Sequence, residues 1–278
     1  MRFEPQPEEL ARHTASLSEI GRFLALMTRL RGPGGCPWDQ KQTFESLRPY
    51  LIEETYEVID AIDAGDAEGH VEELGDLLLQ IVFHAEISRE AGRWDMGAVA
   101  AGVTDKLYQR HPHVFAEVAA ATPEEALQSW ETVKAQEKAR KGKARESVLD
   151  GVPKAAPALN RAERLSDKAA GVGFDWPDAA GARDKVREEL AELDEAIAAG
   201  DPRAIEGELG DLLFAVVNLG RKLGLHSEDA LRGTLRRFEA RFRHLEQGLA
   251  AEGKRPSDLD LESLDARWEV AKEVTSDT

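Results

Sequence analysis

An internal repeat is the feature of this sequence that most constrains its fold. Residues 51–80 align without a gap with residues 186–215, and fourteen of these 30 positions are identical. Average residue usage would give roughly two identities over such a length. The chain therefore contains two copies of one supersecondary unit.

The two copies are separated by a segment that is first basic and then rich in turn-forming residues. Residues 138–160 carry several lysines and arginines, followed by glycine and proline beside Asp150. We predict one repeat over residues 19–145 and a second over 146–278, and we interpret residues 1–18 as a loose extension.

Both copies show the apolar spacing of helices, and we predict an all-α fold of two tandem helical bundles. Alanine, leucine and glutamate are abundant whereas aromatic residues make up only 6%, which favours helices over strands. Leu51 and Ile62 are expected on a buried helical stripe, and Gly65 and Gly200 end corresponding helices. The predicted helices of the first copy cover residues 17–31, 47–64, 68–91, 96–110 and 123–141.

Each copy brings together carboxylates from two successive helices. Glu53, Glu54 and Glu57 share one helix face, since residues three and four apart lie on the same side. Fifteen residues separate Glu57 from Glu73, which shares a face of the next helix with Asp76. A tight turn joins the two helices, so they should pack antiparallel with their acidic faces together. The equivalent residues of the second copy are Glu188, Glu189, Glu192, Glu208 and Asp211.

A cluster of carboxylates opposes folding unless a cation neutralises it. Hard divalent cations prefer oxygen ligands, and Mg²⁺ suits sites that also hold phosphates. A solvated glutamate-rich face is the common alternative for a single motif of this kind. We favour metal binding because the acidic set recurs in both copies and adjoins the apolar runs Leu77–Leu79 and Leu212–Phe214.

Charge and cysteine content disfavour several classes of protein. With 53 acidic and 36 basic residues the net charge is −17, so nucleic-acid binding through a basic surface is not expected. The single cysteine, Cys36, permits no intramolecular disulfide and suits a reducing compartment. The N-terminus lacks the apolar core of a signal peptide, and no apolar run approaches the roughly 20 residues that span a bilayer. We therefore expect a cytoplasmic protein without a membrane partner.

Together these motifs resemble the MazG family of the all-α nucleoside triphosphate (NTP) pyrophosphohydrolase superfamily, in its long two-copy bacterial form. The resemblance rests on the EExxE and ELGDLL motifs and covers nearly the whole chain. Further segments that carry it are Cys36–Gln40, Lys106 with Arg110, His111–Phe115 and Gly173–Trp176. It implies hydrolysis of NTP to the monophosphate and pyrophosphate, a Mg²⁺ cofactor that Mn²⁺ can replace, and an intertwined homodimer.

The resemblance also implies roles for the acidic residues. Glu53 or Glu188, each one residue before a proposed ligand, would orient or deprotonate the water that attacks the α-phosphorus. The implied Mg²⁺ ligands are Glu54, Glu57, Glu73 and Asp76 in the first copy, and Glu189, Glu192, Glu208 and Asp211 in the second.

Phosphoryl transfer also needs positive groups near the developing negative charge. Basic residues four positions apart can present two such groups on one helix face, with a solvated basic face as the alternative. The candidates are Lys106 and Arg110 in the first copy and Arg237 and Arg241 in the second. Lys185, just before the second acidic helix, is a further candidate for binding phosphate. Trp130 and Trp268 can stack on a base or pack in the core, and Lys134 and Lys272 lie one turn beyond them.

The two copies are not equivalent. Gly207 stands in the second copy where the first has Glu72, and Tyr50 stands in the first copy where the second has Lys185. Long members of the family typically have the stronger catalyst in the C-terminal copy, whereas the lost carboxylate opposes that choice. The less active copy would be structural, dimerising or regulatory.

Three other functions are considered. A narrower substrate, such as a dUTP-like, damaged or alarmone nucleotide, would keep the same chemistry. A ferritin-like di-metal oxidase is disfavoured, because such bundles use Glu-x-x-His whereas the second motif here ends in Asp76 or Asp211. A non-enzymatic helical module would bind nucleotide with Mg²⁺ without turning it over.

Overall fold

The computed structural model describes residues 3–116, 122–140 and 147–274. All regular secondary structure in these ranges is helical, so the prediction of an all-α fold is confirmed. The chain divides into two compact units, Met1–Ala144 and Arg145–Thr278, and each holds one copy of the repeat. The boundary predicted between residues 145 and 146 lies within 141–146, outside the described residues. No helix in the described ranges is long and apolar enough to cross a membrane.

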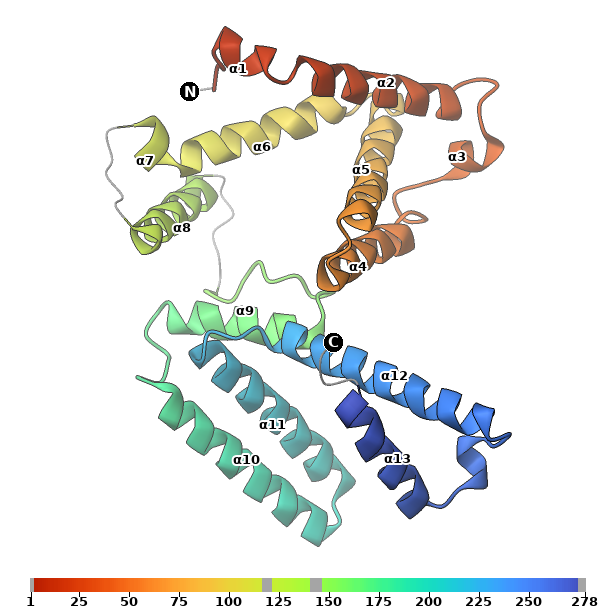
Figure 1. Cartoon of the computed structure of the whole chain (residues 1–278). Coiled ribbons are helices and arrows are strands. Elements are labelled where there is room, and N and C mark those ends of the chain that lie inside the picture. Colours follow the sequence, from red (N-terminus) through yellow and green to blue (C-terminus); the bar gives the residue numbers. More distant parts are fainter. Residues whose placement is uncertain (1–2, 117–121, 141–146, 275–278) are drawn as a thin grey trace. The chain divides into compact units, whose positions relative to one another are not determined.

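The first unit is built around a hairpin of two long helices, α4 and α5 (Figure 1). Its helices are α1 (Pro7–Ala11), α2 (Thr14–Arg31), α3 (Pro37–Lys41), α4 (Arg48–Ala64), α5 (Ala67–Glu90), α6 (Met96–Arg110), α7 (Pro112–Phe115) and α8 (Pro123–Arg140). α2 lies against α5, and α6 packs against α8. A small core forms where α2 meets α5, from Met27, Leu47, Val82 and Phe83.

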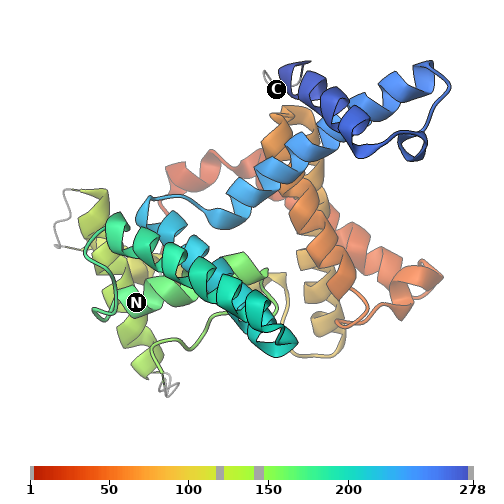
Figure 2. The same ribbon diagram turned by 90° about the horizontal axis from the view of Figure 1, so that it is seen from below.

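The second unit repeats the hairpin with α10 and α11. Its helices are α9 (Ala158–Ala170), α10 (Ala179–Ala199), α11 (Pro202–Lys222), α12 (Ser227–Ala251), the short 3₁₀ helix η1 (Pro256–Asp258) and α13 (Leu261–Val274). α9 packs against α11 and α12, and α12 packs against α13. The α12–α13 pair is seen in blue in Figure 1 and, from below, in Figure 2.

Equivalent turns give the two hairpins the same local geometry. Gly65 and Gly200 end α4 and α10 with φ of 65° and 70°, in the left-handed region that glycine adopts without a steric penalty. The aspartates that follow, Asp66 and Asp201, cap α5 and α11 by accepting hydrogen bonds from two backbone N–H groups each. The helix ends predicted from Gly65 and Gly200 are therefore found in the structure.

The hairpins differ at the start of their first helix. α4 begins at Arg48 with Pro49 in its first turn, where proline does not interrupt the helical hydrogen bonds. α10 begins earlier in the repeat, at Ala179, because the Asp178 side chain accepts hydrogen bonds from the backbone of Ala180 and Gly181. Lys185 therefore lies inside α10, and its predicted position before the helix is wrong.

Two further expectations differ from the structure. Residues 1–18 include α1 and the first turn of α2, which begins at Thr14. Leu51 and Ile62 are 36% and 55% exposed, so their predicted burial is wrong; Ala61 is the buried residue of α4. The reason is that α5 is the main neighbour of α4 within the unit, so one side of α4 stays uncovered.

Candidate metal and nucleotide site

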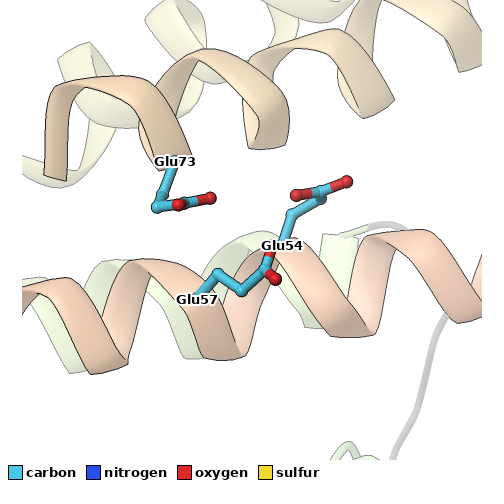
Figure 3. Close-up of side chains that lie close together, drawn as sticks. All are labelled: Glu54, Glu57 and Glu73. Atoms are coloured by element: carbon cyan, nitrogen blue, oxygen red, sulfur yellow. The ribbon is translucent and has the colours of Figure 1, made fainter. Parts of the chain in front are cut away.

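Three glutamates meet across the first hairpin. Glu54 and Glu57 come from α4, and Glu73 comes from α5 and points towards them (Figure 3). One carboxylate oxygen from each residue lies within 4.8 Å of the other two. The antiparallel packing of α4 on α5 thus joins two acidic motifs that are distant in the sequence.

The electrostatics of this cluster favour protonation or a cation. Burial raises the pKa of Glu54, and a hydrogen bond with Glu57 and the charge of Asp76 raise it further. The pKa of Glu73 is also raised, by desolvation and by the charges of Glu57 and Asp76. Like charges at this spacing disfavour the ionised state of each group. A bound divalent cation would reverse that effect.

The second hairpin brings together the equivalent glutamates. One oxygen each of Glu189, Glu192 and Glu208 lies within 4.8 Å of the other two. Glu189 is only 5% exposed, whereas Glu192 is exposed. Desolvation and the charge of Glu189 raise the pKa of Glu192. The geometry of the three ligand atoms therefore recurs in the second unit.

Lysine 185 distinguishes the second cluster from the first. Its Nζ lies 2.6 Å from Oε1 of Glu189 and 2.7 Å from Oε1 of Glu188. These contacts raise the pKa of Lys185. At the matching position of the first unit, Tyr50 packs edge-on against Trp38 with ring centroids 6.0 Å apart. Among the described residues, no lysine or arginine is paired with the three glutamates of the first cluster.

The donor sets of both clusters fit a hard divalent cation. Every donor is a carboxylate oxygen, and such sets suit Mg²⁺ or Mn²⁺ better than thiophilic metals. Asp76 is close enough to raise the pKa values of Glu54 and Glu73. Asp211 is exposed and lies outside the group of three oxygens. Glu53 and Glu188 are exposed as well.

The sequence analysis missed Gln80. Its Nε2 donates a 3.4 Å hydrogen bond to Oε1 of Glu54, and the residue is buried. A polar residue one turn beyond Asp76, at the end of the apolar run 77–79, was the available signal. The second unit has Ala215 at the matching position, so Glu189 lacks an equivalent amide partner.

Two basic candidates of the first unit, Arg110 and Lys134, contact residues outside the acidic cluster. The guanidinium of Arg110 donates to Glu137 at 2.8 Å and lies 5.3 Å from the ring centroid of Trp130. Nζ of Lys134 lies over the same Trp130 ring, 4.3 Å from its centroid. Lys106 is exposed on α6. Arg110 on α6 therefore contacts α8 through Glu137 and Trp130.

Apart from Lys185 on α10, the basic candidates of the second unit lie on α12 and α13. Arg237 donates to the Thr234 hydroxyl at 3.0 Å, and Lys272 pairs with Glu269. The Trp268 ring packs on Phe238 with centroids 5.1 Å apart. Arg241 follows Arg237 by one turn on α12. Lys185 contacts the carboxylates of its cluster directly, with Nζ 2.6 Å from Oε1 of Glu189.

Comparison with known proteins gives a family match on the two hairpins. The model of the "MazG nucleotide pyrophosphohydrolase domain" matches residues 42–115 and again residues 181–245. Both clusters of glutamates fall inside these ranges, whereas Trp130, Lys134, Trp268 and Lys272 fall outside them.

Three relatives extend this match over most of the chain. "Nucleoside triphosphate pyrophosphohydrolase" of Escherichia coli K12 is 45% identical over 259 residues, which cover 92% of this chain and 98% of the relative. "Nucleoside triphosphate pyrophosphohydrolase/pyrophosphatase MazG" of Thermotoga maritima is 47% identical over 250 residues, covering 90% and 94%. "Uncharacterized protein YabN" of Bacillus subtilis is 42% identical over 257 residues, covering 92% of this chain but 52% of the relative.

Proposed function

The chain belongs to the MazG nucleotide pyrophosphohydrolase family, and from this premise we propose that it hydrolyses NTPs or deoxy-NTPs to the monophosphate and pyrophosphate with Mg²⁺. The predicted family and enzyme class are confirmed by the relatives. The observation that carries the metal-dependent mechanism is the meeting of three glutamate oxygens within 4.8 Å in each unit. As a cellular role we propose nucleotide-pool house-cleaning or control of an alarmone, in the reducing environment of the cytoplasm.

Carboxylates on facing helices are proposed to hold Mg²⁺, or Mn²⁺ in its place. A bound cation would supply positive charge to the phosphate oxygens and increase the acidity of a water molecule. The close oxygens of the three glutamates support this assignment, and Asp76 and Asp211 would add a donor from the second helix. The proposed ligands are Glu54, Glu57, Glu73 and Asp76, and Glu189, Glu192, Glu208 and Asp211.

Glu53 and Glu188 are proposed to accept the proton of the attacking water. Both are exposed carboxylates that directly precede a proposed ligand. The water oxygen would bond to the α-phosphorus, the bond from this phosphorus to the pyrophosphate oxygen would break, and the proton would pass to the glutamate. Positive side chains would stabilise the phosphate charge. The candidates are Lys185, Arg237, Arg241 and Lys272, and Lys106, Arg110 and Lys134.

A homodimer would explain two features of the units. Large apolar side chains remain exposed on both hairpins, and surfaces of this kind commonly mark protein interfaces. Examples are Ile52 and Val71 in the first unit and Ile197 and Leu213 in the second. A second chain packed there would bury these side chains. Among the described residues, the glutamates of the first cluster pair with no lysine or arginine of their own chain, and a second chain would offer a source of such residues.

Product analysis tests the proposed reaction. The purified chain is incubated with each common NTP and deoxy-NTP, with Mg²⁺ or with EDTA, and the products are separated by anion exchange. We expect monophosphate and pyrophosphate only with Mg²⁺. Diphosphate and orthophosphate would contradict attack at the α-phosphorus. Magnesium-dependent nucleotide binding with no product from any nucleotide, including modified ones, would favour the non-enzymatic module.

A further inference from the structure

Lys185 lies within the cluster where the second unit is proposed to bind a cation. It bridges Glu188 and Glu189, and Glu189 is both a proposed ligand and the most buried carboxylate of its cluster. An ammonium group at 2.6 Å from a buried carboxylate provides a counter-charge that the fold itself supplies. A divalent cation that binds Glu189 must therefore compete with this lysine.

The first unit offers the opposite arrangement. Tyr50 replaces the lysine, and Gln80 gives Glu54 a neutral hydrogen-bond donor in place of a charged one. Among the described residues, no lysine or arginine side chain forms an ion pair with the three glutamates of this unit. The repulsion among these carboxylates is relieved when a divalent cation binds, and it therefore favours binding.

We propose that Lys185 is a resident counter-ion that makes cation binding by the second unit depend on nucleotide, whereas the first unit binds a divalent cation without nucleotide. This inference rests on the proposed function, because it assumes that both clusters are metal sites. It assigns to Lys185 two alternative partners, the glutamates in the free protein and a phosphate of the nucleotide in the complex.

The exchange of partners follows from the reach of the lysine. Lys185 is half-buried and contacts glutamates three and four positions further along α10, so its flexible side chain can turn to another anion near the cluster. When a phosphate attracts the ammonium group, Glu189 becomes available as a ligand and Glu188 becomes available as a proton acceptor. Nucleotide and cation should therefore bind the second unit with positive coupling.

Binding of Mn²⁺ without nucleotide separates the two units. Free Mn²⁺ is measured by its electron paramagnetic resonance signal in solutions of the full chain. Glu192→Gln weakens the second site and reports the first, whereas Glu57→Gln weakens the first and reports the second. We expect the first site to bind Mn²⁺ at least about tenfold more tightly than the second site. This ratio lies in the usual range of coupling free energies between sites.

Reciprocal substitutions assign this difference to one position. In the Glu57→Gln background, Lys185→Met should strengthen Mn²⁺ binding about tenfold and weaken the binding of α,β-methylene-ATP, measured by calorimetry at saturating Mn²⁺. In the Glu192→Gln background, Tyr50→Lys should weaken Mn²⁺ binding. Arg187→Met is the matched control, because Arg187 is an exposed cation of α10 that pairs with Asp184.

The opposite signs for metal and nucleotide distinguish this role from a structural one. Equal Mn²⁺ affinities of the two units, unchanged by Lys185→Met and Tyr50→Lys, would overturn the inference alone. A chain that binds no Mn²⁺ at either cluster would overturn the proposed metal sites and this inference together. The Mn²⁺ measurement needs no turnover. If the first site binds Mn²⁺ more tightly than the second but the chain releases no pyrophosphate, only the proposed reaction is contradicted.

Discussion

The two hairpins have the same backbone plan and different charge partners. In both, a glycine in the left-handed region and a capping aspartate join the helices, and three glutamate oxygens meet within 4.8 Å. In the first hairpin Gln80 is the neighbour that donates to the cluster, whereas in the second it is Lys185. Repetition has thus preserved the positions of the carboxylates while single substitutions changed what neutralises them.

This difference shows which properties of a repeated site can diverge easily. Ligand positions depend on the turn and on helix packing, so a change there would disturb the whole hairpin. The charge beside the ligands depends on one or two side chains, which can be exchanged without moving the backbone. Two sites of equal shape can therefore differ in cation affinity and in activity.

The largest expected effect separates the two clusters by activity. Glu192→Gln or Glu57→Gln should lower kcat on the order of 10²–10³-fold in whichever unit is the catalyst, because a charged group that supports the transition state is lost. Release of pyrophosphate is measured for both variants. Asp60→Asn and Glu195→Gln, exposed carboxylates one turn beyond the clusters, serve as controls. Equal, small losses in both variants would contradict catalysis at either cluster.

Arginines that form ion pairs at the ends of the hairpins allow the two units to be compared by their free energy of unfolding. The side chain of Arg31, in the first unit, is only 5% exposed. It pairs with Glu90 through two hydrogen bonds and also donates to the carbonyls of Asp39 and Gln42. Arg31→Met should lower the free energy of unfolding by about 2–3 kcal/mol, because these partners lose a buried donor.

Replacing Arg221, which occupies a different position of the repeat in the second unit, should cost less. Arg221 pairs with Asp175, whose pKa is lowered by Arg221 and by Lys222. After Arg221→Met, Lys222 still holds Asp175 at 3.2 Å, so we expect a loss of about 1–2 kcal/mol. Urea unfolding measures both variants. A larger loss for Arg221→Met would reverse the comparison.

Gln80 offers a finer test of the first cluster. Gln80→Ala copies the second unit at this position and removes the donor to Glu54, so Mn²⁺ binding at the first site should weaken about tenfold, as for residues that orient metal ligands. Titration in the Glu192→Gln background measures the effect. The hydrogen bond is dispensable if Gln80→Ala leaves the Mn²⁺ affinity unchanged.

The smallest expected effect is a pH dependence of the free energy of unfolding, which arises from His226 in the second unit. Nδ1 of His226 lies 2.7 Å from Oε1 of Glu163, which raises the pKa of the histidine in the folded state. Its stabilising contribution is complete below the unfolded pKa of about 6.5 and is lost as pH rises through the folded value. The exposed histidine limits this contribution to at most about 1 kcal/mol.

Urea unfolding at a series of pH values tests this assignment. The difference in unfolding free energy between the wild-type chain and His226→Gln should be largest near pH 5.5 and should vanish at alkaline pH. A difference that stays constant over this range would exclude protonated His226 as its source.

The sequence by itself determined the all-α class, the two hairpins and the meeting of their acidic faces. These features depend on contacts between residues close in the chain: helical periodicity, a glycine at each turn and an aspartate cap. Positions three and four apart must share a face once the helix forms. The repeat then required that both units have the same plan.

Only the tertiary structure decided which surfaces are covered and which charges meet. Leu51 and Ile62 have the spacing of a buried stripe, but α4 has too few neighbours to cover them. The pairing of Lys185 with Glu189 is local in sequence, yet it depends on α10 beginning at Ala179. Arg110 meets Glu137 because α6 packs on α8. Burial and charge pairing between helices follow from packing, which a local pattern does not contain.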